Sequence, residues 1–257
     1  MNFTAHKNPS QNKLTGRVAL ITGASKRMGR AIALALAEEG VHIVAHDRRK
    51  MEKEVISVCN DVKKCGSKSW NIMADLERPE QYSTLILQSI KIAGSLQILI
   101  NNASLFLPST LGDVGFNDVI RHIHVNAWAP LVLSREFARL ARHGTIINLL
   151  DTKIVGYDKT HVAYNLSKKL FCSLTSLCAV EFFPHITVNG VAPGLILPPE
   201  GKDENYLNQL AQFVPLRHHG DIQDITDVVL YLSRSRFVTG QIIYVDGGRH
   251  LLEDLYG

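Results

Sequence analysis

RVALITGASKRMGRAIALALAEE, residues 17–39, is the stretch that decides the fold of this chain. Its first part, Arg17–Thr22, is a short apolar run of the kind that forms a buried strand. Its last part, Met28–Glu39, has the apolar spacing of a helix, and the turn between the two parts holds Gly23 and Gly29. A strand, a glycine turn and a helix in this order predict a βα unit whose helix amides face an anion.

The same alternation of short apolar runs and amphipathic segments continues along the chain and predicts a parallel sheet. Further strands are expected at Val41–His46, Ser67–Ala74, Gln97–Asn101, Thr145–Leu150, Ile186–Val191 and Gln241–Val245. Helices are expected before about Lys64 and at Pro79–Ala93, Phe116–Arg142, Thr160–Phe183 and Asp221–Ser233, with a loose lid over Leu195–Pro215. The predicted fold class is α/β: one Rossmann-type, doubly wound parallel sheet with helices on both faces. Residues 1–14 are expected to form a flexible tail and residues 15–257 a single domain.

Composition and charge argue against several classes of protein. The chain has 257 residues, 46% of them hydrophobic, and a formal net charge of +4 that is scattered along the sequence. Scattered charge argues against nucleic acid as a partner. The polar N-terminus lacks the core of a signal peptide and no run of about 18 apolar residues occurs, so we expect a cytoplasmic protein without membrane contact. The four cysteines are expected to be reduced, and no metal site is expected, because the cysteines and histidines lack ligand spacing.

Three further motifs follow the glycine turn: Asn101-Asn102-Ala103, Tyr164-x-x-x-Lys168 and Pro193-Gly194. In this order and spacing the chain resembles the short-chain dehydrogenase/reductase family from about residue 15 to residue 250. The resemblance implies a nicotinamide dinucleotide, with Asp75 beside its adenine and Asn101 shaping the pocket. The residues implied to bind it are Gly23, Ser25, Arg27, Met28, Gly29, Asp47, Arg48, Arg49, Asp75, Leu76, Asn102, Ala103, Tyr164, Lys168, Pro193 and Gly194. Arg27 stands where the family has the middle glycine of the turn.

The residues after the second expected strand bear on which dinucleotide binds. Asp47 holds the position of an acid that accepts from the ribose 2′-hydroxyl of NADH, while Arg48 and Arg49 suit the 2′-phosphate of NADPH. One charge pair at ~6 Å is worth about 3 kcal/mol at an effective dielectric constant of ~20. Two or three guanidiniums, Arg27 included, can therefore outweigh one carboxylate. The pattern favours NADPH and leaves NADH open.

Tyr164 and Lys168 lie four residues apart on an expected helix, so their side chains share one face. An ammonium beside a phenol favours the phenolate, so we expect Lys168 to lower the pKa of Tyr164 from its reference of ~10. Tyr164 is then the predicted proton donor. By the family resemblance, Asn126 anchors a proton relay behind this pair.

The residue thirteen positions before the tyrosine departs from most of the family, which has a serine there; this chain has Asp151. A carboxylate stabilises an oxyanion poorly, but it can accept hydrogen bonds from amino and ring N–H groups, or deliver a proton to a ring nitrogen. Asp151 therefore indicates reduction of a C=N bond in a nitrogen-rich ring. A purely structural alternative is that Asp151 is an acid that caps a helix or lies on a surface loop.

The set Asp151, Tyr164 and Lys168 resembles the pteridine reductase branch of the family, which includes dihydromonapterin reductases. Lys26-Arg27-Met28-Gly29 matches the basic glycine turn of that branch, and Asp246-Gly247-Gly248-Arg249-His250 is similar to its C-terminal motif. By this resemblance the substrate is a dihydropterin. The residues implied to bind it are Arg27, Ser104, Phe106, Asp151 and Tyr164, with Phe106 stacking on the pterin. Phe106 is also compatible with an ordinary core aromatic.

Two other functions stay open at this point. One is a general carbonyl or 3-oxoacyl reductase, which Asp151 in place of serine disfavours. The other is a dinucleotide-binding regulatory protein without catalysis, which the joint presence of Asn126, Tyr164 and Lys168 disfavours. The family resemblance also implies a homotetramer that forms through the helices at Phe116–Arg142 and Thr160–Phe183.

Overall fold

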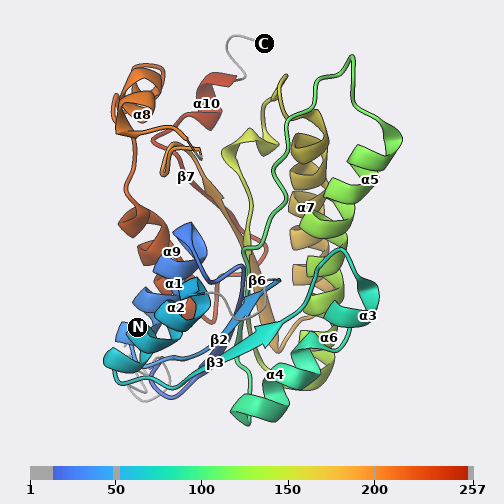
Figure 1. Ribbon diagram of the computed structural model, residues 1–257, viewed down its shortest axis with the longest axis vertical. Coiled ribbons are helices and arrows are strands. Elements are labelled where there is room, and N and C mark those ends of the chain that lie inside the picture. Colours follow the sequence, from blue (N-terminus) through green and yellow to red (C-terminus); the bar gives the residue numbers. More distant parts are fainter. Residues whose placement is uncertain (1–13, 49–52, 200, 254–257) are drawn as a thin grey trace, which may run out of the picture.

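The computed structural model describes residues 14–48, 53–199 and 201–253 (Figure 1). Seven parallel strands form one sheet in the order β3-β2-β1-β4-β5-β6-β7. In chain order they are β1 (Val18–Thr22), β2 (His42–Asp47), β3 (Ser69–Met73), β4 (Ile98–Asn101), β5 (Gly144–Leu149), β6 (Ile186–Pro193) and β7 (Ile242–Val245). Arg49 and residues 1–13 of the expected tail lie outside the described residues.

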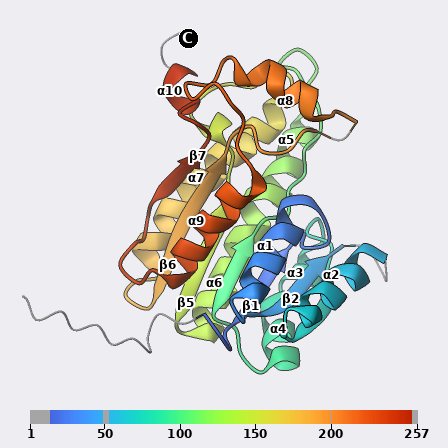
Figure 2. The same ribbon diagram turned by 90° about the vertical axis from the view of Figure 1, so that its left-hand side faces the viewer.

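Helices cover both faces of the sheet, as the sequence predicts (Figure 2). One face packs against α1 (Arg27–Glu38), α2 (Lys53–Lys64) and α9 (Ile222–Arg234). The other face packs against α3 (Pro79–Tyr82), α4 (Leu85–Ala93), α6 (Ala129–Ala141) and α7 (Val162–Glu181). The strands β1, β4 and β5 are almost wholly buried because both of their faces are covered. The predicted fold class, a doubly wound Rossmann-type sheet, is confirmed.

Two expected helices differ from the prediction in a physically informative way. The expected helix Pro79–Ala93 is divided into α3 and α4, and between them the Thr84 hydroxyl donates to the Gln81 carbonyl at 3.4 Å. The expected helix Phe116–Arg142 consists of α5 (Phe116–Ile123) and α6, joined without a break by a π-helical turn, His124–Trp128. Such turns are common at functional sites.

The segment expected to be a loose lid contains an additional helix, α8 (Glu204–Ala211). Asp203 caps it by accepting from the backbone N–H of Tyr206, a signal that the sequence carries and that the prediction overlooked. A short final helix, α10 (His250–Glu253), was also not expected. Both lie with β7 at the same end of the molecule in the two views (Figures 1 and 2).

The order of the strands fixes where a ligand can bind. β1 has β2 on one side and β4 on the other, so the chain winds away from it in both directions. Open α/β sheets bind ligands at such a switch point, outside the carboxyl ends of the strands. The residues that end or follow β1, β4, β5 and β6, namely Gly23, Asn102, Leu150 and Gly194, all meet at this edge and line one cleft.

Candidate active site

A cleft of about 500 Å³ opens at the carboxyl edge of the sheet. The predicted site residues that line it are Gly23, Ser25, Arg27, Met28, Gly29, Asp47, Arg48, Asp75, Leu76, Asn102, Ala103, Ser104, Phe106, Asp151, Tyr164, Lys168, Pro193 and Gly194. Thus the structure brings together residues that the sequence spreads over 172 positions. Residues that line the cleft and were not predicted include His46, Glu77 and Ile196.

The glycine turn is shaped by a close backbone approach. A Cβ atom on Gly29 would lie 2.1 Å from the carbonyl oxygen of Gly23, so no other residue fits there. Gly23 has φ +63°, in the left-handed region, and so does Arg27, with φ 52°, at the place of the family's middle glycine. The turn therefore retains its tight geometry although one glycine is replaced.

The start of α1 is suited to an anion. The residue before it, Lys26, provides no side-chain hydrogen bond to cap the helix, and the first turn holds no acidic residue. Instead Arg27 occupies the first position, where the positive end of the helix dipole disfavours a cation unless an anion is bound. The backbone N–H groups of a helix start, its positive end and a guanidinium fit a dinucleotide pyrophosphate.

The side chains around the expected ribose position already have partners. The Ser25 hydroxyl donates a short hydrogen bond to Asp47. Arg48 lies 3.9 Å from a carboxylate oxygen of Glu77, and 59% of its side chain is exposed. Arg27 donates to the carbonyl oxygen of Pro198 at 2.7 Å and so links the glycine turn to the segment after β6. Because its ion pair with Glu77 is long and its side chain is largely exposed, Arg48 can still bind a phosphate group at the mouth of the cleft.

The two asparagines after β4 have different places. Asn102 donates from its amide to the carbonyl oxygens of Thr22 at 2.8 Å and Gly23 at 3.0 Å, and it lines the cleft. Asn101 is buried and donates to the side chain of Asn148 at 2.9 Å, which ties β4 to β5. Asn101 therefore does not line the cleft and supports the sheet beneath it, contrary to the expectation that it shapes the pocket.

At the end of β5, Asp151 contacts the predicted proton donor directly. The Tyr164 hydroxyl donates to one Asp151 oxygen at 2.8 Å, and the other oxygen accepts from the Lys153 backbone N–H at 2.8 Å. The second bond caps the short 3₁₀ turn Thr152–Ile154. Asp151 therefore combines the capping role, considered as the alternative, with a place in the site. The cap fixes the carboxylate so that its other oxygen faces Tyr164.

The expected direction of the Tyr164 pKa is wrong. Burial raises the pKa of Tyr164 well above its usual value, and the charge and hydrogen bond of Asp151 raise it further. Lys168 does not offset this, because its Nζ donates to the Leu149 carbonyl at 2.7 Å and lies 5.8 Å from the centre of the Tyr164 ring. Burial lowers the pKa of Lys168 to about 8, although Asp151 acts in the opposite direction. Tyr164 consequently keeps its proton near neutral pH.

Asn126 lies in the π turn, fully buried behind the cleft. Its amide oxygen accepts from the Leu105 backbone N–H at 2.6 Å, and its nitrogen donates to Leu105 O at 2.8 Å and to the Ser167 hydroxyl at 2.9 Å. Ser104, which lines the cleft, also donates to Asn126 at 3.3 Å. Asn126 therefore holds the segment after β4 against α7; its part in a proton relay stays a prediction.

The aromatic wall of the cleft is made by Phe106. Its ring meets the ring of Tyr164 edge-on, with centroids 4.7 Å apart, and 46% of the residue is exposed. It is therefore not an ordinary core aromatic. On the other side the ring of His161 is stacked on Phe106, at 4.0 Å and 14°. The sequence analysis missed His161, because no motif or spacing relates it to Phe106.

The C-terminal motif supports the catalytic loop. The Thr152 hydroxyl donates a short hydrogen bond to buried Asp246, which also accepts from the His250 backbone N–H at 2.8 Å. A Cβ atom on Gly194 would lie 2.5 Å from the Cβ of Asp246, so this glycine permits close packing. Asp246 therefore holds together the end of β7, the Pro193-Gly194 turn and the residue next to Asp151.

The fold and the cleft together define an α/β oxidoreductase. The chain belongs to the short-chain dehydrogenase/reductase family: residues 23–250 match a model of that family described as enoyl-(acyl carrier protein) reductase. The predicted family and the prediction of a short-chain oxidoreductase are confirmed.

Relatives within the family differ in activity. The chain is 29% identical to glucose 1-dehydrogenase of Gluconobacter oxydans, with 96% of each chain covered. It is 30% identical to 3-oxoacyl-[acyl-carrier-protein] reductase FabG of Staphylococcus epidermidis, over 91% of this chain and 98% of that one. Among solved structures it is similar to FolM alternative dihydrofolate reductase 1 from Brucella canis complexed with NADP, with a TM-score of 0.85 and 29% identity over 93% and 96% of the two chains. These relatives establish the family. Because their activities differ, the substrate has to be inferred from the residues of the site.

Proposed function

We propose that this protein is an NADPH-dependent reductase of dihydropterins that acts on a C=N bond of the dihydropterin ring. The observation that carries the proposal is the hydrogen bond between Tyr164 and Asp151 at the end of β5. In this bond, a phenol that keeps its proton lies beside a carboxylate that can accept hydrogen bonds from ring N–H groups. The exposed ring of Phe106 offers a flat surface at the same end of the cleft.

When bound, reduced nicotinamide supplies a hydride for the carbon of the C=N bond. Tyr164 donates the proton to the nitrogen, so the double bond becomes a single bond that carries two new hydrogens. Asp151 accepts hydrogen bonds from amino and ring N–H groups and so orients the ring. Lys168, held by Leu149, keeps a positive charge close to Tyr164 and to the dinucleotide.

The dinucleotide is proposed to bind along the glycine turn, with its pyrophosphate at the start of α1. NADPH is favoured because Asp47 already accepts a hydrogen bond from Ser25, while Arg48 is exposed at the mouth of the cleft. Arg49, the second arginine of the prediction, lies outside the described residues. The similarity to a reductase complexed with NADP agrees with this preference. NADH remains the alternative.

A dinucleotide-oxidation assay tests substrate and cofactor together. Dihydromonapterin, dihydrofolate, dihydrobiopterin and a panel of small ketones are each supplied with NADPH and with NADH. We expect turnover of a dihydropterin, with NADPH preferred. A wild type that reduces ketones and is inert toward every dihydropterin would instead support a carbonyl or 3-oxoacyl reductase, and absence of all turnover would support the regulatory alternative.

Asp151→Ser makes the test sharper. Loss of a hydrogen bond to a charged group costs about 1.5–3 kcal/mol, so dihydropterin reduction should fall more than about 10-fold. Activity on simple ketones should hold or rise, because the change restores the serine usual in the family. Asp227→Ser, on the exposed side of α9, is the matched control and should leave both activities unchanged. Equal losses on both substrate classes would contradict the assignment of Asp151.

A further inference from the structure

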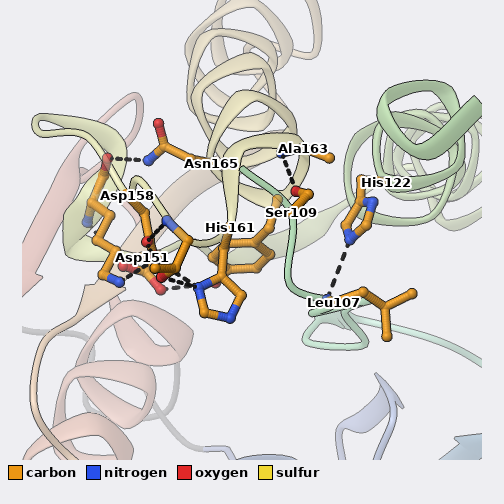
Figure 3. Close-up of polar contacts among 11 residues, drawn as sticks. Leu107, Ser109, His122, Asp151, Asp158, His161, Ala163 and Asn165 are labelled. Carbon is orange, nitrogen blue, oxygen red and sulfur yellow. Dashed lines mark hydrogen bonds and ion pairs between the residues drawn. The ribbon is translucent and has the colours of Figure 1, made fainter. Parts of the chain in front are cut away.

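We propose that His161 is a positioning residue for the substrate: anchored by Asp158, its imidazole holds the Phe106 ring as the wall against which a flat substrate ring packs. This inference rests on the proposed function, since it concerns the same cleft. It goes beyond that function by assigning a role to a side chain outside every motif of the sequence. Figure 3 shows His161 and Asp158 together at the start of α7, beside Asp151.

The first step is the anchor of His161. Its Nδ1 lies 3.1 Å from a carboxylate oxygen of Asp158, and because a carboxylate only accepts, the ring donates its Nδ1–H. Asp158 is 8% exposed and also accepts from Lys153, by a short bond, and from the Thr160 backbone N–H at 2.9 Å. Burial opposes its ionisation, but the hydrogen bonds from Lys153 and Thr160 hold the pKa of Asp158 below the usual carboxyl range. The imidazole is therefore tied to a fixed negative charge.

The second step is the contact between the two rings. His161 and Phe106 are stacked almost parallel, and the Phe106 ring then meets Tyr164 at nearly a right angle. His161 thus covers one face of Phe106, while the phenylalanine keeps 46% of its surface exposed beside the cleft. Removing the imidazole would free the Phe106 ring to rotate away from Tyr164.

The third step is that main-chain hydrogen bonds already fix the backbone positions of the segments that carry Phe106 and His161. Ser109 donates its N–H to the Thr160 carbonyl at 2.9 Å and accepts from the Val162 N–H at 3.0 Å. His122 accepts from the Leu107 N–H at 3.3 Å. The segment that carries Phe106 is therefore attached to the start of α7 without His161. The imidazole is left to set the direction of the Phe106 side chain, which makes its effect separable from folding.

The experiment compares His161→Ala with His161→Phe, which keeps a stacking ring. The stacking of two aromatic rings contributes enough free energy for about a fivefold change in affinity. His161→Ala should therefore raise KM for the dihydropterin about fivefold, with kcat little changed. The dissociation constant of NADPH should stay within twofold, and His161→Phe should restore KM. His185→Ala, an exposed histidine at the start of β6, is the control and should match the wild type.

A second comparison asks whether the effect passes through Phe106. In a Phe106→Leu background, His161→Ala should cause no further rise in KM, because the stacking partner is already absent. An unchanged KM in His161→Ala, or equal rises in His161→Ala and His161→Phe, would overturn the proposal. Weaker NADPH binding in parallel with the KM would do so too, since it would indicate a merely structural role.

The two proposals can fail separately. A wild type that reduces dihydropterins while His161→Ala keeps its KM refutes only the positioning role. If the wild type reduces ketones alone, the proposed function fails, and the variants are then compared on a flat aryl ketone and an acyclic ketone. A KM increase confined to the aryl ketone would still support the role of His161, and an equal effect on both would overturn it.

Discussion

At the scale of single residues, the site depends on how burial, Asp151 and Lys168 act on Tyr164. Asp151 makes a direct hydrogen bond to the hydroxyl, whereas Lys168 is held below the ring by a main-chain carbonyl. Burial raises the pKa of Tyr164 well above its usual value and Asp151 raises it further, so the phenol keeps its proton. A proton donor has to be protonated when its substrate binds, and this arrangement meets that condition.

Tyr164→Phe is the direct test of that role. It removes the donor while leaving the ring that contacts Phe106, so turnover should fall by roughly 10²–10⁴-fold. Dinucleotide binding, followed by fluorescence titration, should stay within a few-fold. Tyr157→Phe, at a residue that is 88% exposed, serves as control. Near-full activity in Tyr164→Phe would remove Tyr164 from the mechanism.

The pH dependence follows from the lowered pKa of Lys168, about 8. Activity should decline as the pH rises through about 8, since the ammonium then loses its proton. The contribution of Lys168 to stability should move the other way: between about 8 and the ordinary value of 10.5 this residue binds fewer protons in the folded chain than in the unfolded one, so its contribution makes unfolding harder as the pH rises.

Rate profiles and melting temperatures recorded from pH 6 to about pH 10 check both trends. Lys168→Arg keeps its charge over this range and should lack the alkaline decline in activity. A wild-type rate that climbs steadily through pH 8 would contradict the role of the ammonium.

The sequence allowed most of these residues to be predicted but not their electrostatic balance. Spacing places Tyr164 and Lys168 on one face of a helix, yet it cannot show that Lys168 turns to Leu149. Likewise the link from Thr152 to Asp246 spans 94 positions, so no local pattern reveals it. His161 was missed for the same reason, because its partner Phe106 belongs to another segment.

At the scale of elements, the β1–α1 turn is the least tolerant part of the cleft. Gly29→Ala would press a methyl group against the Gly23 carbonyl and the Asn102 amide, which must then move. We expect a loss of about 1–3 kcal/mol in the free energy of unfolding, together with much weaker dinucleotide binding. Thermal unfolding and titration measure the two effects. Gly112→Ala, where the nearest atom is 3.9 Å away, should be neutral, and equal behaviour of the two variants would contradict the packing argument.

Strong apolar alternation made the strands and main helices predictable. The features that the prediction missed, namely the helix break, α8 and the π turn, involve polar hydrogen bonds. At the break between α3 and α4 the Thr84 hydroxyl donates to the Gln81 carbonyl, and α8 begins at a cap provided by Asp203. The π turn arises around Asn126, whose bonds to Leu105 and Ser167 join three segments of the chain. Only the cap at Asp203 could have been recognised from adjacent residues.

At the scale of the whole molecule, no described helix is both long and apolar enough to span a bilayer. Large apolar side chains nevertheless remain exposed on α5 and α7. Leu177 and Val180 on α7 are 63% and 70% exposed, and Phe116 at the start of α5 is 78% exposed. Exposed apolar patches of this kind mark surfaces that bind other proteins.

We predict that this surface joins copies of the chain into a homotetramer. Light scattering should then give a mass about four times 28.5 kDa. Leu177→Asp should dissociate the assembly, because it buries a charge at the interface. Leu251→Asp, equally exposed on α10, should not. A wild type that stays monomeric at micromolar concentration would contradict the prediction.

The π turn at His124–Trp128 also has a consequence for the length of the chain. A hydrogen bond that spans one residue more than in an α-helix means that this stretch holds one residue beyond what a regular helix needs. Deleting a single residue here would let α5 and α6 join as an ordinary helix with their faces kept in phase, because the wide turn absorbs the additional residue. The change would be confined to the backbone around Asn126, so a chain one residue shorter would keep both helices and lose the position from which Asn126 accepts the Leu105 N–H.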